Sequence, residues 1–240
     1  MRAKKQLVFE TVIESSFRSH EKKFQAFMRE NVAEYRVNAE MITPDLGDPR
    51  AVFARIAFAI LSANAPFDDS VKALDYALTC AGTASPKVLT QWKMIPAKAR
   101  YLNEAWDKIN NITPLRIAGD ANLYRWQVTK LDCESWSSYR YRLQKMFKGL
   151  GIAKASFAVS LLYPLTADVA CLDTWMQKVF LGNTSFKSLS KVTYETVEQR
   201  ITKYARALNV STFLAQWMIW DHARGGELEE AKTVNISSSD

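Results

Sequence analysis

The chain has 240 residues and a formal net charge of +7. Hydrophobic residues make up 48% of it and charged residues 24%, which excludes a disordered chain and allows a sizeable core in one two-lobed domain or two small ones. The positive charge favours an acidic partner such as nucleic acid, although a merely basic globular protein would carry the same charge.

Cysteine and histidine usage excludes several kinds of site. The three cysteines are far apart and odd in number, so neither a disulfide framework nor a paired-cysteine metal site is indicated, and we expect a reducing compartment. His20 and His222 are the only histidines, which leaves little basis for a histidine-rich metal site or a Ser-His-Asp hydrolase. No secretory start and no apolar run approaching about 18 residues is present. We therefore expect no membrane attachment and a cytoplasmic location, or a nuclear one in a eukaryotic host.

The first quarter of the chain is helical in pattern. Apolar positions recur at helical spacing through residues 1–40, which predicts one or two amphipathic helices. Residues 43–49 are rich in proline and glycine and are expected to form a loop. Residues 51–64 are apolar nearly all round, which predicts a buried helix, and 66–70 are expected to break the chain and cap the next helix.

The rest of the chain continues this pattern. Further helices are predicted at residues 71–80, 86–92, 96–109, 115–119, 124–131, 136–147, 153–162, 173–180, 193–208 and 210–225. No alternating run is long enough for a sheet, so the predicted fold class is all-α. Basic residues on these helices, Lys98 among them, are expected on solvated faces, and the polar tail at 229–240 is expected to be frayed or disordered.

A glycine-rich stretch from Lys148 to Ala155 precedes one of these helices. Gly149 and Gly151 flank Leu150, and glycines so placed predict a tight turn, because only glycine takes positive φ without steric cost. The next helix would begin directly beyond this hairpin, with its first N–H groups pointing outward at the positive end of the helix dipole. Such a helix start can hold a phosphate.

Asp173 lies about 20 residues beyond the hairpin, directly ahead of apolar positions that begin at Trp175 and Met176. This place predicts a helix N-cap, and as a cap alone the residue would contribute about 1 kcal/mol. The alternative is a carboxylate near a phosphate grip, where it can stabilise a developing positive charge or activate water.

The hairpin at residues 147–151, the helix at 153–162 and the spaced Asp173 together resemble the helix-hairpin-helix (HhH-GPD) DNA glycosylase superfamily, which includes endonuclease III. The resemblance extends over roughly residues 50–225. It implies an enzyme that extrudes a nucleotide from DNA and breaks the bond between base and deoxyribose, because a stacked base shields the anomeric carbon.

The resemblance also implies a two-lobed, all-α architecture. Residues 50–168 would form a six-helix lobe that ends in the hairpin and its following helix. Residues 1–49 together with 169–240 would form the second lobe, and the base pocket would lie between the two. The expected partner is DNA in duplex form, bound by a monomer.

Site roles follow from the same resemblance. Asp173 would be the catalytic carboxylate. Asn64 would fill the gap that a flipped nucleotide leaves in the duplex, with a polar helix C-cap as the alternative. Trp175 would wall the base pocket or simply pack, whereas Trp217 and Trp220 are expected in the core. DNA contacts are expected from Lys145, Lys148, Gly149, Leu150, Gly151 and Lys154.

One departure concerns the lysine of the family's strand-cleaving members. They carry it two residues after the second hairpin glycine, where its amine attacks C1′ and forms a Schiff base. Here Ala153 takes that place and Lys154 follows it, turned by about 100° on a helix. A monofunctional, water-using enzyme fits this arrangement better, although a one-residue change in the turn would restore Lys154 as a catalytic group.

A second departure concerns the cofactor. His222, Ala223 and Arg224 are similar to the segment ahead of the iron–sulfur ligands in endonuclease III, but Glu227 stands near the place of the first expected cysteine. No iron–sulfur cluster and no other metal cofactor is predicted, apart from a monovalent cation that the hairpin carbonyls could hold.

Three functions remain open on the sequence. The leading one is a monofunctional DNA glycosylase that acts on a modified or mismatched base through Asp173. The second is an enzyme of the same fold, as in some bacteriophage branches, that replaces a group on the C5 substituent of hypermodified thymine without excising the base. The third is a non-catalytic DNA-binding module that uses the hairpin alone.

Overall fold

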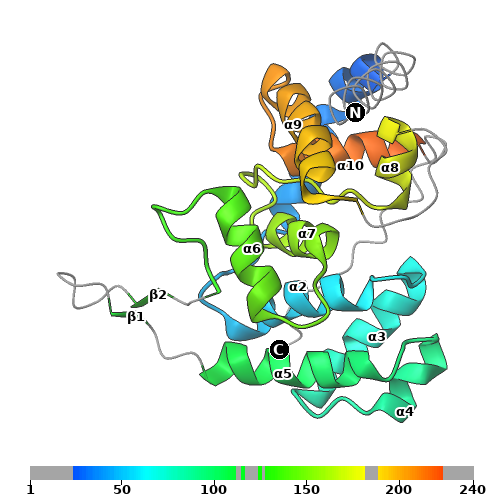
Figure 1. Ribbon diagram of the computed structural model, residues 1–240, viewed down its shortest axis with the longest axis vertical. Helices are drawn as coiled ribbons and strands as arrows, with labels where there is room; N and C mark the ends of the chain where they lie inside the picture. The colour runs from blue at the N-terminus through cyan, green and yellow to red at the C-terminus, as the bar shows by residue number, and fades with distance from the viewer. Residues whose placement is uncertain (1–23, 112–114, 117–123, 126–127, 182–188, 224–240) are drawn as a thin grey trace, which may run out of the picture. The chain divides into compact units, whose positions relative to one another are not determined.

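A computed structural model describes residues 24–111, 115–116, 124–125, 128–181 and 189–223 (Figure 1). Within these residues the chain is helical apart from one short pair of strands, which confirms the all-α prediction. They divide into two compact units. The central unit runs from Thr43 to Tyr163, and the terminal unit combines residues up to Ile42 with those from Pro164 onward. No helix in the described ranges is long and apolar enough to cross a membrane.

Both units are built from consecutive helices. Those of the central unit are α2 (Pro49–Leu61), α3 (Phe67–Cys80), α4 (Pro86–Leu89), the 3-10 helix η1 (Thr90–Trp92), α5 (Ala97–Asn111), α6 (Trp136–Met146) and α7 (Ile152–Leu162). Those of the terminal unit are a helix at residues 24–41, α8 (Thr174–Leu181), α9 (Lys191–Ala207) and α10 (Thr212–Ala223). Most predicted helices are thus confirmed, with shifted ends.

α2 is the core helix of the central unit. Asp48 caps its start by accepting the Arg50 N–H at 2.8 Å, and Pro49 fits the first helical position because no N–H is needed there. Every residue from Val52 to Leu61 is buried, as the all-round apolar pattern predicted. Figure 1 shows α2 between α5 and α7, and it packs against both as well as against α3.

The break after α2 is shorter than the sequence indicated. Residues 66–70 were expected to lie outside a helix, but α3 begins at Phe67 with Pro66 as its N-cap. Asp68 and Asp69 therefore lie in the first turn of α3, where carboxylates interact favourably with the positive end of the helix dipole.

The helices predicted at residues 115–119 and 124–131 are wrong for every described residue in them. Leu115–Arg116 (β1) pairs antiparallel with Tyr124–Arg125 (β2), and residues 128–131 form no helix. Strands of two residues are too short to show the alternation by which a sequence reveals a strand. The helical spacing of the apolar residues here was therefore misleading.

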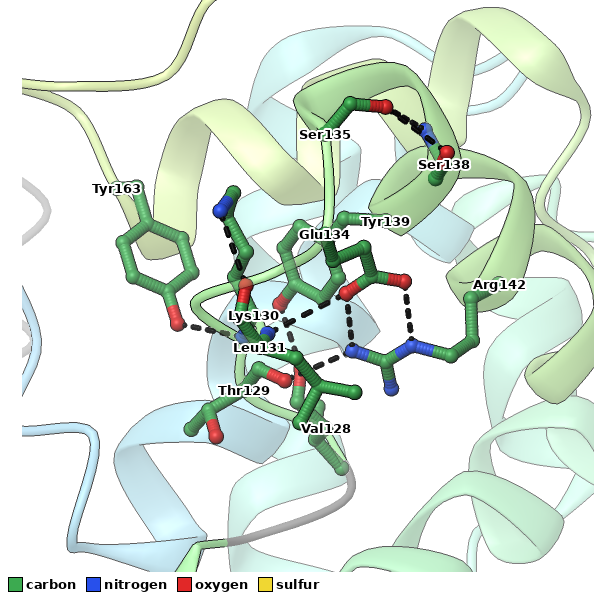
Figure 2. Close-up of polar contacts among 10 residues, drawn as sticks. All are labelled: Val128, Thr129, Lys130, Leu131, Glu134, Ser135, Ser138, Tyr139, Arg142 and Tyr163. Atoms are coloured by element: carbon green, nitrogen blue, oxygen red, sulfur yellow. Dashed lines mark hydrogen bonds and ion pairs between the residues drawn. The ribbon is translucent and has the colours of Figure 1, made fainter.

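Side chains satisfy the backbone of the irregular segment 128–134, which Figure 2 shows in front of α6. The Arg142 guanidinium donates to both Glu134 carboxylate oxygens at 2.8 Å and to the Thr129 carbonyl at 2.8 Å. Burial by itself would raise the pKa of Glu134, but the hydrogen bonds from Arg142 and from the Leu131 N–H outweigh it and lower that pKa. The Arg142–Glu134 ion pair, with the bond to Thr129, therefore links the two ends of segment 128–134.

Two tyrosines complete the same network (Figure 2). The Tyr163 hydroxyl accepts the Lys130 N–H at 2.8 Å, and the buried Tyr139 hydroxyl donates to the Val128 carbonyl. Backbone groups that a helix would have paired internally are paired here with side chains from α6 and from just beyond α7. The backbone of residues 128–131 therefore needs no helix to satisfy these hydrogen bonds.

In the terminal unit, the helix at residues 24–41 is joined to the end of α10. The buried Tyr35 hydroxyl donates to the Asp221 carboxylate at 2.5 Å, and its ring packs edge-on to Trp217 at 5.3 Å between centroids. Burial and then the hydrogen bond to Asp221 raise the pKa of Tyr35 well above its usual value. The last turn of α10 is thereby held in place within its unit.

Candidate functional site

The two glycines of the predicted hairpin have different conformations. Gly149 has a φ of +90°, as a tight turn requires. Gly151 has a φ of −70° and is the N-cap of α7. The expectation that both glycines supply positive φ is therefore wrong for Gly151, because an N-cap has an extended conformation that any residue adopts.

The space around the two glycines also differs. A Cβ on Gly149 would lie 2.8 Å from Cδ2 of Tyr101 and 3.3 Å from Cγ2 of Ile60, so the chain is tightly enclosed there. Leu150 is buried and anchors the turn. A Cβ on Gly151 would meet nothing within 4 Å, and no side chain of the described residues caps α7. The start of α7 is thus open, which is the local geometry that a phosphate needs.

The lysines predicted to surround the hairpin lie in two settings. Lys145 and Lys148 are exposed, and the Lys148 ammonium forms an ion pair with Glu104 at 3.1 Å. Lys154 is half-buried, and its Nζ donates to the Ser62 hydroxyl at 3.1 Å. Lys145 and Lys148 therefore offer charge at the surface, whereas Lys154 is directed to the end of α2.

A second lysine holds the same end of α2. Lys98, expected on a solvated face, is only 5% exposed, and its Nζ donates to the carbonyls of Leu61 at 2.7 Å and Ala63 at 2.8 Å. Burial, with a smaller contribution from the Lys154 ammonium, lowers the pKa of Lys98 to about 8. The solvated placement was wrong because the last carbonyls of α2 lack helical partners and attract a cation.

Asn64 lies in the turn that these lysines hold. The alternative of a C-cap is wrong in register, because Ser62 is the C-cap of α2. Asn64 is exposed and has a φ of +53°, a conformation that asparagine tolerates better than most residues. Its amide side chain is therefore presented at the surface by a turn that is itself fixed.

Asp173 is the N-cap of α8, as its place in the sequence predicted. Its Oδ1 accepts the Met176 N–H at 2.9 Å, and its Oδ2 accepts the indole N–H of Trp220 at 2.9 Å. Hydrogen bonds donated to a carboxylate favour its ionised form. Asp173 as a residue is half-buried, so it lies at the edge of its unit and not in its core.

The backbone reaches Asp173 through four buried residues, 169–172, which we call the strap. Three successive N–H groups of the strap donate to buried side chains of α9 and α10. The pairs are Ala170 with Glu198 at 2.8 Å, Cys171 with Gln216 at 2.5 Å and Leu172 with the Tyr194 hydroxyl at 3.1 Å. A buried N–H without a partner costs about 1–3 kcal/mol, so these side chains fix the path of the chain to Asp173.

Trp175 lies in the first turn of α8, close to Asp173 in sequence. Its side chain is 38% exposed, and the Lys178 ammonium lies 4.3 Å from the ring centroid. The indole therefore offers a flat apolar surface at the start of α8, with a cation–π contact that helps to hold the ring.

The side chains that hold Asp173 were missed in the sequence. Trp220, expected in the core, is half-buried and donates to the carboxylate. Glu198 and Gln216 are polar residues on the buried faces of α9 and α10. A polar residue at a position where the helical pattern predicts burial could have identified both as residues with a structural or functional partner. The described residues contain no group of three or more His, Cys, Asp or Glu that could hold a metal ion.

Comparison with solved structures identifies the fold. The 8-oxoguanine DNA glycosylase of Thermotoga maritima is 17% identical and superposes with a TM-score of 0.67, over 87% of this chain and 98% of its own. The chain has the helix-hairpin-helix DNA glycosylase fold. The 8-oxoguanine DNA glycosylase of Methanocaldococcus jannaschii shares this glycosylase fold at 16% identity and a TM-score of 0.59, over 91% of this chain and 95% of its own.

A third structure with the glycosylase fold contains DNA. It is the Methanocaldococcus jannaschii 8-oxoguanine glycosylase/lyase in complex with a 15mer that contains 8-oxoguanine, at 15% identity and a TM-score of 0.64, over 85% of this chain and 96% of its own. No protein-family model and no curated protein sequence matches the chain. Identities this low establish the fold and leave the activity to be argued from the site.

Proposed function

We propose that this protein is a DNA glycosylase-like enzyme that flips a modified or mismatched base out of duplex DNA and cleaves its N-glycosidic bond. The observation that carries the proposal is the Asp173 carboxylate, half-buried and hydrogen-bonded through both oxygens at the start of α8. The solved structures with the same fold support it, since all three are named as glycosylases of 8-oxoguanine and one is bound to DNA.

The chemistry requires a fixed negative charge. As the bond between C1′ and the base breaks, the bonding electrons leave with the base nitrogen and C1′ acquires oxocarbenium character. The Asp173 carboxylate stabilises that positive charge and accepts a proton from the water that adds to C1′, while the departing base takes up a proton. The products are free base and an abasic deoxyribose.

The open start of α7 supports a grip on the DNA backbone. A phosphate there would accept hydrogen bonds from the first N–H groups of α7, which have no partner within the helix and lie at the positive end of the helix dipole. Lys145 and Lys148 add exposed positive charge at the hairpin, although Lys148 already pairs with Glu104. Binding through these groups is expected to weaken steeply with salt.

The surroundings of Lys154 support a monofunctional reaction. Its amine donates to Ser62 and lies 5.3 Å from the centroid of the Phe157 ring, and Ala153 stands where strand-cleaving relatives of this fold carry lysine. Water, and not an enzyme amine, would then attack C1′. Borohydride treatment during the reaction is expected to trap no covalent protein–DNA adduct, because no Schiff base forms.

Two exposed side chains fit the remaining roles. Asn64, on its fixed turn, would enter the duplex in place of the extruded nucleotide, and Trp175 would stack on the flipped base. The proposed enzyme acts as a monomer in the cytoplasm. It uses no iron–sulfur cluster, because the chain lacks the cysteine expected after Arg224.

The test is mass spectrometry of free bases and of digested nucleosides after incubation with duplexes that carry damaged, mismatched or C5-modified bases. Wild type is expected to release one free base, and Asp173→Asn is expected to lose at least about a hundredfold in rate while DNA binding remains. A mass change on a retained nucleoside would instead establish base modification. Equal DNA binding with no product from any substrate would favour a non-catalytic module.

A further inference from the structure

Among the described residues, the Met176 N–H and the Trp220 indole N–H, which differ in origin, both donate to the Asp173 carboxylate. Oδ1 accepts the Met176 N–H from its own helix, as any N-cap does. Oδ2 accepts the indole N–H of Trp220, which is 47 residues away on α10. The cap needs only the first of these bonds, so the second calls for a separate explanation.

An indole N–H has properties that suit it to orient a carboxylate. It is a donor only, so it pairs with a carboxylate lone pair and cannot reverse its direction as a hydroxyl can. It is carried by a rigid ring with two side-chain torsions. A bond from such a donor selects one orientation of the carboxylate plane and favours the ionised acid, which is the form that stabilises a cation.

Trp220 is itself held at the end of α10. The next residue, Asp221, accepts the buried Tyr35 hydroxyl from the helix at residues 24–41 at 2.5 Å. One turn earlier, Gln216 holds the Cys171 N–H of the strap at 2.5 Å. α10 therefore contacts the Asp173 segment twice, once at its backbone and once at its carboxylate, from a helix whose last turn is anchored.

We propose that Trp220 is a positioning residue for Asp173, whose indole N–H fixes the direction and the ionised state of the carboxylate that faces the reacting deoxyribose. This inference rests on the proposed glycosylase function and adds a residue to it. In this role Trp220 does not touch the DNA and acts on the reaction through Asp173. Gln216 and Trp220, one turn apart on α10, then act on the same segment, Gln216 on its backbone and Trp220 on the Asp173 carboxylate.

The variant that tests this role is Trp220→Phe, which removes the N–H donor and keeps an aromatic ring. Single-turnover base release near neutral pH is expected to slow about tenfold, and the acidic limb of the pH–rate profile is expected to move to higher pH by about one unit. DNA affinity should stay at the wild-type value. The matched control is Trp217→Phe on the same helix, whose ring packs on Phe213 and Tyr35 and whose loss should leave the acidic limb in place.

A second measurement does not depend on activity. The ¹³C carboxyl resonance of Asp173, assigned by its loss in Asp173→Asn, is followed against pH in wild type and in Trp220→Phe. Its titration midpoint should move to higher pH in the variant by about one unit. If wild type releases no base, the proposed function fails while this titration still tests the role of Trp220. An unmoved midpoint, or a variant with the rate and acidic limb of wild type, would overturn the inference.

Discussion

The start of α7 in the central unit and the start of α8 in the terminal unit each carry candidate functional residues, and they are built in different ways. At α7, consecutive residues suffice: Gly149 makes the turn, Leu150 anchors it and Gly151 leaves the helix start open. At α8, the cap itself is local, but the strap before it and the second carboxylate oxygen depend on side chains 22 to 47 residues away.

This difference reflects the different task that each helix start would perform. A phosphate grip needs an exposed row of N–H groups, which a short turn with glycine supplies by itself. A carboxylate that stabilises a short-lived cation must be held to within a fraction of an ångström, which requires support from several directions. The start of α7 should therefore be sensitive to its own residues, and the start of α8 to distant ones.

The largest expected effect of a single substitution is local to the hairpin. Gly149→Ala should lower the free energy of unfolding by about 3 kcal/mol, because alanine is strained at a φ of +90° and its Cβ would lie 2.8 Å from Tyr101. Urea denaturation of the full chain measures this change. A loss below about 1 kcal/mol would mean that the hairpin relaxes easily and is less enclosed than Tyr101 and Ile60 indicate.

A smaller effect is expected from a distant support of α8. Gln216→Leu leaves the buried Cys171 N–H without its acceptor and should cost about 2 kcal/mol in unfolding free energy, and it should also slow base release. The control is Ser160→Ala, because the buried Ser160 hydroxyl has no partner among the described residues and its removal orphans no other group. Equal effects of the two substitutions would show that the strap does not depend on Gln216.

The same contrast explains how far the sequence could be read. The hairpin, the helix after it and the cap at Asp173 are short-range patterns, and all three were predicted correctly in place. Gly151 was expected to have a positive φ and does not, because φ cannot be predicted from residue type alone. Lys98 and Trp220 were misplaced, since a partner 35 or more residues away leaves no periodic trace in the chain. The helix prediction at 124–131 failed because side chains from outside the segment, Arg142 and Tyr163, pair with its backbone, and helical spacing gives no sign of them.

Lys98 gives a pH-dependent test of support from a distance. Its pKa falls from 10.5 to about 8 in the folded protein, so between these values the unfolded chain binds more protons and stability rises with pH through this group. In Lys98→Met this rise should be missing, so the stability of wild type relative to the variant should be greater at pH 10 than at pH 7.5. Denaturation at the two pH values checks it, with the exposed Lys145→Met as control. If wild type and Lys98→Met differed in unfolding free energy by the same amount at both pH values, Lys98 would not titrate in this range.

The substitution with the smallest expected effect on stability, Gly151→Ser, distinguishes a structural role of the hairpin from a role in DNA binding. Gly151→Ser should leave the free energy of unfolding within about 0.5 kcal/mol, because Gly151 has an ordinary φ of −70°, its Cβ site is open and serine is a good N-cap. DNA binding should nevertheless weaken, because the added side chain fills the space that a phosphate would occupy, and the slope of log Kd against log salt should fall by about 1.

The matched control for Gly151→Ser is Ser190→Gly, which makes the reverse change at the cap of α9. It removes the hydrogen bond from the Thr193 N–H and should cost a few tenths of a kcal/mol without changing DNA affinity. A Gly151→Ser protein that binds DNA as wild type does would show that no phosphate sits at the start of α7. Because no contact among the described residues requires glycine at position 151, a requirement for glycine in DNA binding would have to come from the DNA.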